Sequence, residues 1–171
     1  MLCFVIYITT MIGNVLIVVT ITASPSLGSP MYLSLAYLSF IDACYSSVNT
    51  PNLITHSLYG KKAILFNGCM TQVFGEHFFG GAEGILLTVM AYDRYVAICK
   101  PLQYSSIITD QFVARAAIFV VARNGLLTMP IPILSSRLRY CAGHIIKNCI
   151  CTNVSVSKLS CDDITFNQLY Q

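Results

Sequence analysis

Two carboxylates, Asp42 and Glu83, lie inside apolar stretches, where a charge is energetically costly. Each lies 11 residues from the end that we assign to the cytoplasm, near Met31 for Asp42 and at Arg94 for Glu83. At about 1.5 Å per residue, both are about 16 Å deep. Two such carboxylates could share a cation or a proton, because adjacent like charges cannot both stay ionised alone in a low dielectric. The alternative is that each is neutral and hydrogen-bonded to a Ser or Asn side chain such as Asn14.

A second polar pair, Glu76 and His77, lies among Gly75, Gly80 and Gly81. Glycines have no side chains and leave space beside the polar pair. Such an arrangement is typical of a small-molecule pocket with a few placed polar contacts. Glycines in membrane helices also permit close packing between helices, and this alternative stays open. A metal site on Glu76 and His77 is not expected, because consecutive residues of a helix point about 100° apart.

The triplet Asp93-Arg94-Tyr95 stands at the predicted cytoplasmic end of an apolar stretch. An Arg there complements the negative end of a helix dipole, and the neighbouring Asp can restrain the Arg side chain. We interpret the triplet as a candidate switch in which Asp93 restrains Arg94. The alternative is a plain ion pair at the surface. The chain contains no H-E-x-x-H or G-x-S-x-G motif, so an enzyme is not expected.

A polar stretch near the end of the chain holds Cys141, Cys149, Cys151 and Cys161. Their spacing lacks the paired C-x2-C pattern of zinc ribbons, so disulfides in an oxidising compartment are favoured over a zinc site. The N-glycosylation sequon N-V-S begins at Asn153 in the same stretch. Both features indicate that this stretch lies outside the cytosol.

Membrane-spanning helices must position these residues. Apolar residues make up 56% of the 171-residue chain and charged residues 10%, against just under half and about a quarter in an average soluble chain. A bilayer core about 30 Å thick takes about 20 mostly apolar residues per helix. We therefore predict an all-α, multi-pass transmembrane helix bundle followed by a disulfide-rich extracellular loop. The predicted helices cover residues 1–23, 31–54, 68–98 and 111–134, and the loop covers 135–167.

Basic residues alone would orient the chain the other way, because more of them accompany the cysteine cluster than lie near Arg94, Lys100 and Arg115. We overrule that count because clustered cysteines and a sequon make sense only outside the cytosol. A signal peptide is the alternative for the first helix, but that helix lacks a basic n-region and is too long. The net charge of +3 is small and scattered, which excludes a nucleic-acid partner.

Residues 90–102, which read MAYDRYVAICKPL, closely resemble the third-helix signature of olfactory receptors, a branch of the rhodopsin-like G-protein-coupled receptors. Other features of that family stand in register: Gly13-Asn14, Pro30-Met31-Tyr32, and LSFIDACYSS over residues 38–47. The resemblance covers the chain from the first helix to the approach to the fifth.

The resemblance implies a seven-helix plasma-membrane receptor that detects small volatile or hydrophobic odorants. It also implies coupling to a heterotrimeric stimulatory G protein of the olfactory type, which raises cyclic AMP. Arg94, with Asp93 and Tyr95 beside it, would engage the G protein when freed from Asp93. A sodium ion between Asp42 and Glu83 would be the only cofactor, and lipid surrounds the helices. Ligand contacts are expected from the outer third helix: Val73, Glu76, His77, Gly80 and Gly81.

The resemblance also pairs cysteines. Cys69 and Cys151 stand at the positions of the family's conserved bridge, and we pair Cys141 with Cys161, which leaves Cys149 over. These bridges would shape the extracellular loop into a lid over the pocket.

The fourth span departs from the family pattern. The chain has no tryptophan, and Arg123 occupies about the place of the family's tryptophan. An Arg at mid-membrane costs about 2.5–3.5 kcal/mol on insertion scales. Pro130 and Pro132 follow near the helix end, and Thr152 stands where an acidic residue usually follows the cysteine. These departures indicate that the constraint on the sequence is relaxed, or that the gene is a damaged copy.

Two alternative functions stay open. The family's helices five to seven do not follow in this chain, so a truncated, non-signalling receptor product or pseudogene translation is one of them, and we expect the 171-residue chain alone to be retained and degraded. A polytopic cation transporter would explain the intramembrane carboxylates. It would not explain the third-helix signature, and no inverted repeat supports it.

Overall fold

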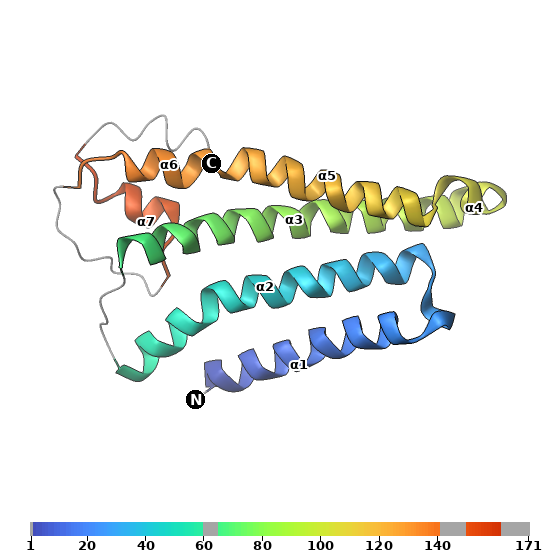
Figure 1. Cartoon of the computed structure of the whole chain (residues 1–171), viewed down its shortest axis with the longest axis horizontal. Helices are drawn as coiled ribbons and strands as arrows, with labels where there is room; N and C mark the ends of the chain where they lie inside the picture. The colour runs from blue at the N-terminus through green and yellow to red at the C-terminus, as the bar shows by residue number, and fades with distance from the viewer. Residues whose placement is uncertain (1, 60–64, 141–149, 162–171) are drawn as a thin grey trace.

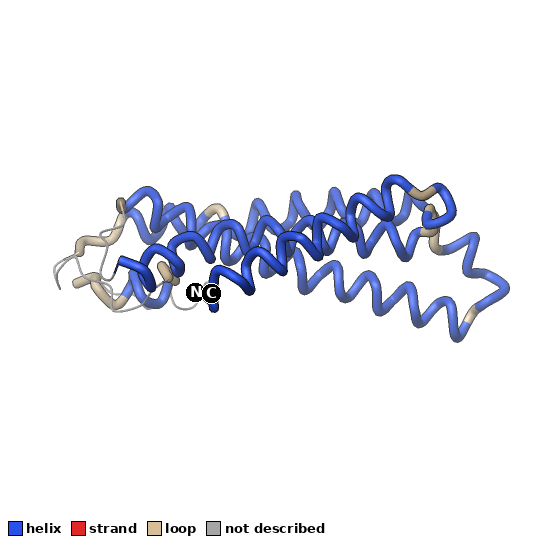
Figure 2. The backbone as a smooth tube through the Cα atoms, turned by 90° about the horizontal axis from the view of Figure 1, so that it is seen from below, coloured by secondary structure: helices blue, strands red, loops and turns tan. Residues whose placement is uncertain are grey.

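The chain folds into long helices that alternate in direction and pack side by side (Figures 1 and 2). The computed structural model describes residues 2–59, 65–140 and 150–161. The long helices are α1 (Leu2–Ala23), α2 (Pro30–Tyr59), α3 (Phe66–Cys99) and α5 (Asp110–Thr128). Within the described ranges, extended pairing is limited to one isolated bridge, between Tyr140 and Ser160. The predicted all-α class is confirmed.

Proline sets the turn between α1 and α2. After Ala23 the residues Pro25–Leu27 form a single 3-10 turn, η1, in which the Leu27 N–H donates to the Ser24 carbonyl at 2.9 Å. α2 then begins at Pro30, where a proline is well tolerated because the first N–H groups of a helix have no partner within it. The turn reverses the chain, so α1 and α2 pack along their lengths.

α2 continues beyond the predicted range 31–54 and passes through Pro51. A proline inside a helix removes one backbone hydrogen bond and usually bends the helix, and the last turns of α2 bend away from α3 in Figure 1. The Thr55 hydroxyl donates to the carbonyl of Pro51 at 3.0 Å and to that of Asn52 at 2.9 Å. These local hydrogen bonds help the helix to persist past the bend.

α3 is the central helix of the described bundle. Its 34 residues span about 51 Å, which exceeds a hydrocarbon core of about 30 Å. It contacts α2, α5 and α6 (Pro130–Ser136), and buried residues occur along its whole length. One apolar cluster around Ala82, Leu86 and Val120 joins α3 to α5 in the middle of the bundle. α3 therefore provides most of the surface against which the other helices pack.

The predicted single helix over 111–134 is corrected to two helices in line. α5 ends at Thr128 and α6 begins at Pro130, and the two follow one another along nearly the same direction in Figure 1. Met129 at the junction keeps a helical backbone, and its N–H donates to Gly125 O at 3.1 Å. The break follows from Pro130 and Pro132, which have no N–H to continue the hydrogen-bond ladder.

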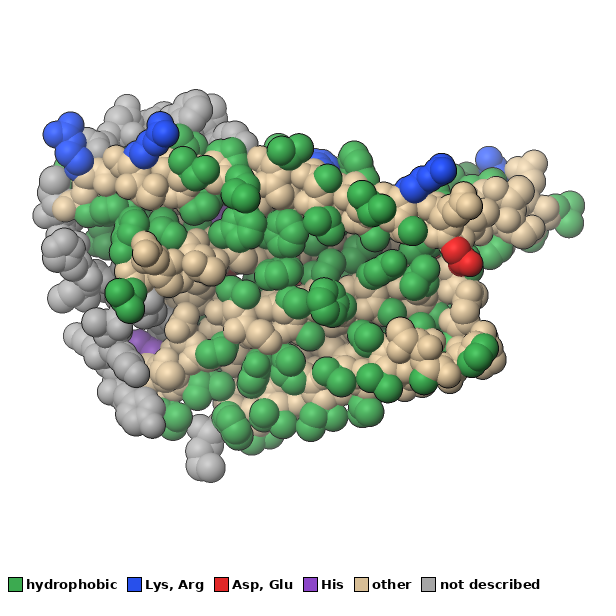
Figure 3. Space-filling model, viewed as in Figure 1, with side chains coloured by type: hydrophobic (Ala, Val, Ile, Leu, Met, Phe, Trp, Pro, Cys, Tyr) green, Lys and Arg blue, Asp and Glu red, His purple; other side chains and the backbone are tan. Residues whose placement is uncertain are grey.

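Apolar side chains cover much of the outer surface (Figure 3). Within the described ranges, the segments that are long and apolar enough to cross a membrane by length and composition are Leu2–Ala23 and Asp110–Ser136. α1 has no buried residue, so its apolar surface suits lipid or further protein. α2 and α3 fail the same criterion because they carry more polar residues. Several of these, including Ser34, Ser39 and Gln72, are buried between helices.

Gly75 allows α3 to pack closely against α2, which leads to a stability prediction. A Cβ atom at Gly75 would lie 2.7 Å from Cγ1 of Val48, so Gly75→Ala should force the helices apart and destabilise the fold by about 1–3 kcal/mol. The matched control is Gly84→Ala, because a Cβ there meets nothing within 4 Å and alanine favours helix over glycine. Thermal unfolding in detergent should therefore show a lower midpoint for Gly75→Ala only. Equal midpoints for the two variants would contradict this packing.

Candidate functional site

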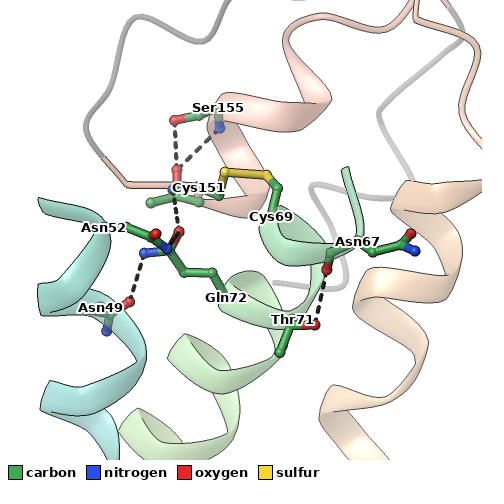
Figure 4. The surroundings of a disulfide bond; sticks show 9 residues. Asn49, Asn52, Asn67, Cys69, Thr71, Gln72, Cys151 and Ser155 are labelled. Atoms are coloured by element: carbon green, nitrogen blue, oxygen red, sulfur yellow. Dashed lines mark hydrogen bonds between the residues drawn. A yellow bond between two sulfur atoms is a disulfide. The ribbon is translucent and has the colours of Figure 1, made fainter. Parts of the chain in front are cut away.

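A disulfide ties the extracellular loop to the outer end of α3. Cys69 lies in the first turn of α3, and Cys151 lies 82 residues later with its Cα atom 5.3 Å away (Figure 4). The bond lies among buried apolar side chains, with Met70 and Val73 from α3 and Val156 from the loop helix α7 (Asn153–Ser157). The structure thus contains the Cys69–Cys151 bridge that the resemblance predicted.

Gln72 connects this bridge to α2. The side chain is 2% exposed, and its Oε1 atom accepts from the Asn52 amide and from the Cys151 N–H, each at 3.3 Å. Its Nε2 atom donates to Asn49 Oδ1, also at 3.3 Å. Figure 4 shows the three amide side chains pointing toward one another below the disulfide. One glutamine therefore joins α2, α3 and the loop.

Sequence reasoning missed this amide cluster. The available signal was the spacing of Asn49 and Asn52, which lie three residues apart and so share a face of a helix. Gln72 lies three residues after Cys69 and therefore shares the face of the disulfide. That the two faces meet depends on the relative rotation of α2 and α3, which the spacing does not contain.

The predicted ligand residues lie on α3 just inside this cluster, where they occupy different environments. Val73 is fully buried in the apolar cluster around the disulfide. His77 is partly buried, and its Nδ1–H donates to the Val73 carbonyl at 2.8 Å. That bond leaves Nε2 as the free ring nitrogen. Glu76 is also partly buried, and its Oε2 atom is buried without a partner among the described residues.

The two glycines of the predicted pocket differ. A Cβ atom at Gly80 would meet nothing within 4 Å, whereas one at Gly81 would lie 3.2 Å from Asn124 Oδ1 on α5. Gly80 therefore borders open space, and Gly81 allows a close approach of α5. The packing interpretation thus applies to Gly81, and the pocket interpretation at Gly80 stays a prediction.

The structure brings Asp42 on α2 and Glu83 on α3 within electrostatic reach of each other. Tyr45, almost one turn further along α2, lies within reach of both Glu83 and Glu76. Within the described ranges, no cluster of three or more His, Cys, Asp or Glu side chains could hold a metal ion. Carboxylates supply the oxygen ligands that hard cations prefer.

At the other end of α3, Asp93 pairs with Tyr104 rather than with Arg94. Asp93 is 5% exposed and accepts a 2.8 Å hydrogen bond from the Tyr104 hydroxyl in the short helix α4 (Tyr104–Ile107). Desolvation, together with this bond and the Asp93 charge, raises the pKa of Tyr104, although Arg94 opposes the rise. Arg94 and Tyr95 are exposed, and Asp93 and Arg94, both described, form no ion pair. The arginine is therefore open to a partner.

The predicted glycosylation of Asn153 stays a prediction, although the side chain is buried in this structure. Asn153 is the first residue of α7 and is 1% exposed, and its Oδ1 accepts from the Ser135 hydroxyl at 2.7 Å and from the Ser157 hydroxyl at 3.4 Å. A glycan would attach to the Nδ2 atom and leave Oδ1 as an acceptor, but this buried side chain would have to become exposed to carry it. Thr152, the residue before the sequon, caps α7, because its hydroxyl accepts from the Ser155 N–H at 3.2 Å.

The predicted Cys141–Cys161 bridge falls partly outside the described residues. Cys161 is disulfide-bonded, but Cys141 and Cys149 are not among the described residues, so the pairing stays a prediction.

Apolar outer surfaces, inward polar clusters and a loop locked to one helix end define a multi-pass helical membrane protein. A family model described as olfactory receptor matches residues 2–171, and the chain belongs to that family. Human olfactory receptor 56A5 is 61% identical over 165 residues, which cover 96% of this chain and 53% of the relative. Human olfactory receptor 56A4 is 52% identical and mouse olfactory receptor 56B34 is 41% identical, over 96% of this chain and 53% and 51% of the relatives. The chain spans about half the length of the curated relatives it matches.

The amide cluster can be tested with Gln72→Leu. The change leaves the Cys151 N–H and the Asn49 and Asn52 side chains without their partner, so we expect a loss of about 2–4 kcal/mol of stability. The neighbouring Thr71→Val is the control, because the Thr71 hydroxyl is exposed and bonds only to its own helix, at Asn67 O (Figure 4). The measurement is the thermal midpoint in detergent under non-reducing conditions. If Gln72→Leu were as stable as Thr71→Val, the cluster would not hold the loop.

Proposed function

We propose that this chain acts in an odorant receptor of the plasma membrane, one that binds small hydrophobic or volatile molecules and activates a stimulatory G protein to raise cyclic AMP. The observation that carries the proposal is the state of the Asp93-Arg94-Tyr95 triplet. Asp93 is buried and bonded to Tyr104, whereas the Arg94 side chain is exposed at the end of a helix longer than the bilayer core. The names of the relatives, all olfactory receptors, support the same function.

The geometry changes how the triplet is proposed to work. In the sequence-based interpretation Asp93 restrains Arg94, but the Asp93 carboxylate accepts from Tyr104 instead. That bond secures α4 against the end of α3 and leaves the guanidinium free for a partner. Arg is suited to this role because its planar fork of donors binds carbonyl and carboxylate groups in fixed geometry. Arg94 is therefore our choice for the G-protein contact.

A sodium ion between Asp42 and Glu83 is part of the proposal. The pair fits this ion because two carboxylates in electrostatic reach need a positive charge or a proton between them. A bound ion would fix α2 against α3 at mid-membrane. Odorant contacts are assigned to Glu76, His77 and Gly80 on the same helix, nearer the disulfide.

Arg94→Ala tests the proposed coupling. We would join this chain to the remaining half of human olfactory receptor 56A5, the relative that it matches at 61% identity, and measure cyclic AMP across a panel of odorants. Odorants that activate the chimera should lose about tenfold or more in potency with Arg94→Ala, because a charged partner is left unpaired. Arg115→Ala is the control, since Arg115 is another exposed arginine, near the start of α5.

Surface labelling of both variants separates signalling from trafficking. A chimera that reaches the surface but answers no odorant would refute the receptor proposal. Full cyclic AMP responses from Arg94→Ala would refute the role of Arg94 alone.

A further inference from the structure

Arg123 on α5 is a charged side chain on an outward, apolar surface. It lies 13 residues from each end of the membrane-spanning stretch Asp110–Ser136, which places it about 20 Å from both ends. The side chain is exposed, and it forms no ion pair or hydrogen bond with another described residue. Arg123 is therefore a cation at mid-membrane without a partner in the described chain.

A charge at the centre of a bilayer is costly unless it reaches the interface or meets a counter-charge. The interface is about 15 Å from the centre of a hydrocarbon core about 30 Å thick. Arginines near helix ends extend along the helix to reach it, but an arginine at mid-helix is too short. The carboxylates inside the bundle are also out of reach, because the adjacent Asn124 is buried against Gly81 and consecutive helical residues point about 100° apart. The counter-charge must therefore come from outside the described chain.

Apolar side chains lie beside Arg123 on this side of α5. Phe119 is 62% exposed and Leu126 is 76% exposed, and they lie four residues before and three residues after Arg123, so the three share one face of the helix. Ala122 beside them is also exposed, and a small residue lets the backbone of another helix approach closely. We call these four residues the Arg123 face. An apolar surface with a single cation suits a membrane helix that is apolar except for one acidic side chain.

We propose that the Arg123 face binds a transmembrane helix of another protein, one that carries a carboxylate at mid-membrane. That carboxylate would form a bidentate ion pair with the guanidinium, and the pair is strong because the surroundings hold no water. A second copy of this chain does not fit, because a two-fold symmetric contact through this face would bring two arginines together. The carboxylates Asp42, Glu76 and Glu83 of such a copy are partly buried on α2 and α3. The contact needs no odorant, so it is independent of the proposed function.

The test uses two leucine-rich transmembrane peptides that differ only in a central glutamate or glutamine. Energy transfer between the fluorescent peptide and the labelled chain, in phosphatidylcholine vesicles at neutral pH, measures their association. The glutamate peptide should bind about tenfold more tightly than the glutamine peptide. Arg123→Leu should abolish this preference. Arg115→Leu should keep it, because Arg115 is exposed near the start of α5, far from mid-membrane.

Charge exchange keeps the test independent of any loss of folding. Arg123→Glu should reject the glutamate peptide and prefer a peptide with a central arginine. Equal binding of the glutamate and glutamine peptides by the unchanged chain would overturn the proposal, and so would a preference that survives Arg123→Leu.

Three further results would assign the Arg123 face to a different occupant and so overturn the proposal. If the chimera with olfactory receptor 56A5 lacked the preference that the chain shows, the remaining half of the receptor would cover the face. If phosphatidylserine in the vesicles removed the preference, lipid head groups would neutralise Arg123. If the chain associated with itself without peptide, and Arg123→Leu abolished that association, the occupant would be a second copy. The proposal expects the preference in the chimera and in both kinds of vesicle, and no self-association that depends on Arg123.

Discussion

The bilayer core offers no water, so each polar group inside a span must find its partner within the protein. Some side chains solve this on their own helix: the hydroxyls of Thr9, Thr22 and Thr88 donate to carbonyls one turn earlier, at 2.9 Å each. The Gln72 amide instead bonds across helices, with Asn52 and Asn49 on α2. This constraint turns polar residues toward α3 and apolar ones outward. Among the described residues, the Oε2 atom of Glu76 and the Nδ2 atom of Asn124 are buried without such a partner.

The two ends of α3 are secured in different ways. At the outer end a covalent bond, an amide cluster and an apolar cluster all hold the loop against α2 and α3. At the other end the hydrogen bond between Tyr104 and Asp93 joins α4 to α3. A covalent link survives local fluctuations that break a single hydrogen bond. The outer end is thus suited to keeping a binding surface in shape, and the Tyr104 end is suited to rearranging when a partner arrives.

The positions of the helices could be predicted from apolar runs and helix-end residues, because both are local signals in the sequence. The hydroxyl of Thr109, for example, caps α5 by accepting from Phe112 N–H at 3.2 Å, as a threonine before an apolar run predicts. The pairing of Gln72 with α2 was not predictable, since it depends on the rotation of two helices about their axes. The burial of Asn153 was missed because a sequon reads the same whether its asparagine is exposed or buried. The end of α2 was placed too early, at residue 54 instead of Tyr59, because the residues after Ile54 are mostly polar and do not read as a membrane span.

Arg123 shows why the negative charges of the bundle interior stay unbalanced. The neighbouring Asn124 is buried against Gly81, and consecutive helical residues point about 100° apart, so Arg123 faces away from α3. The arginine is therefore on the wrong side of α5 to neutralise Asp42, Glu76 or Glu83. Moving a charge of either sign into hydrocarbon without a partner is unfavourable, so the three carboxylates need protons or a positive charge that Arg123 does not supply.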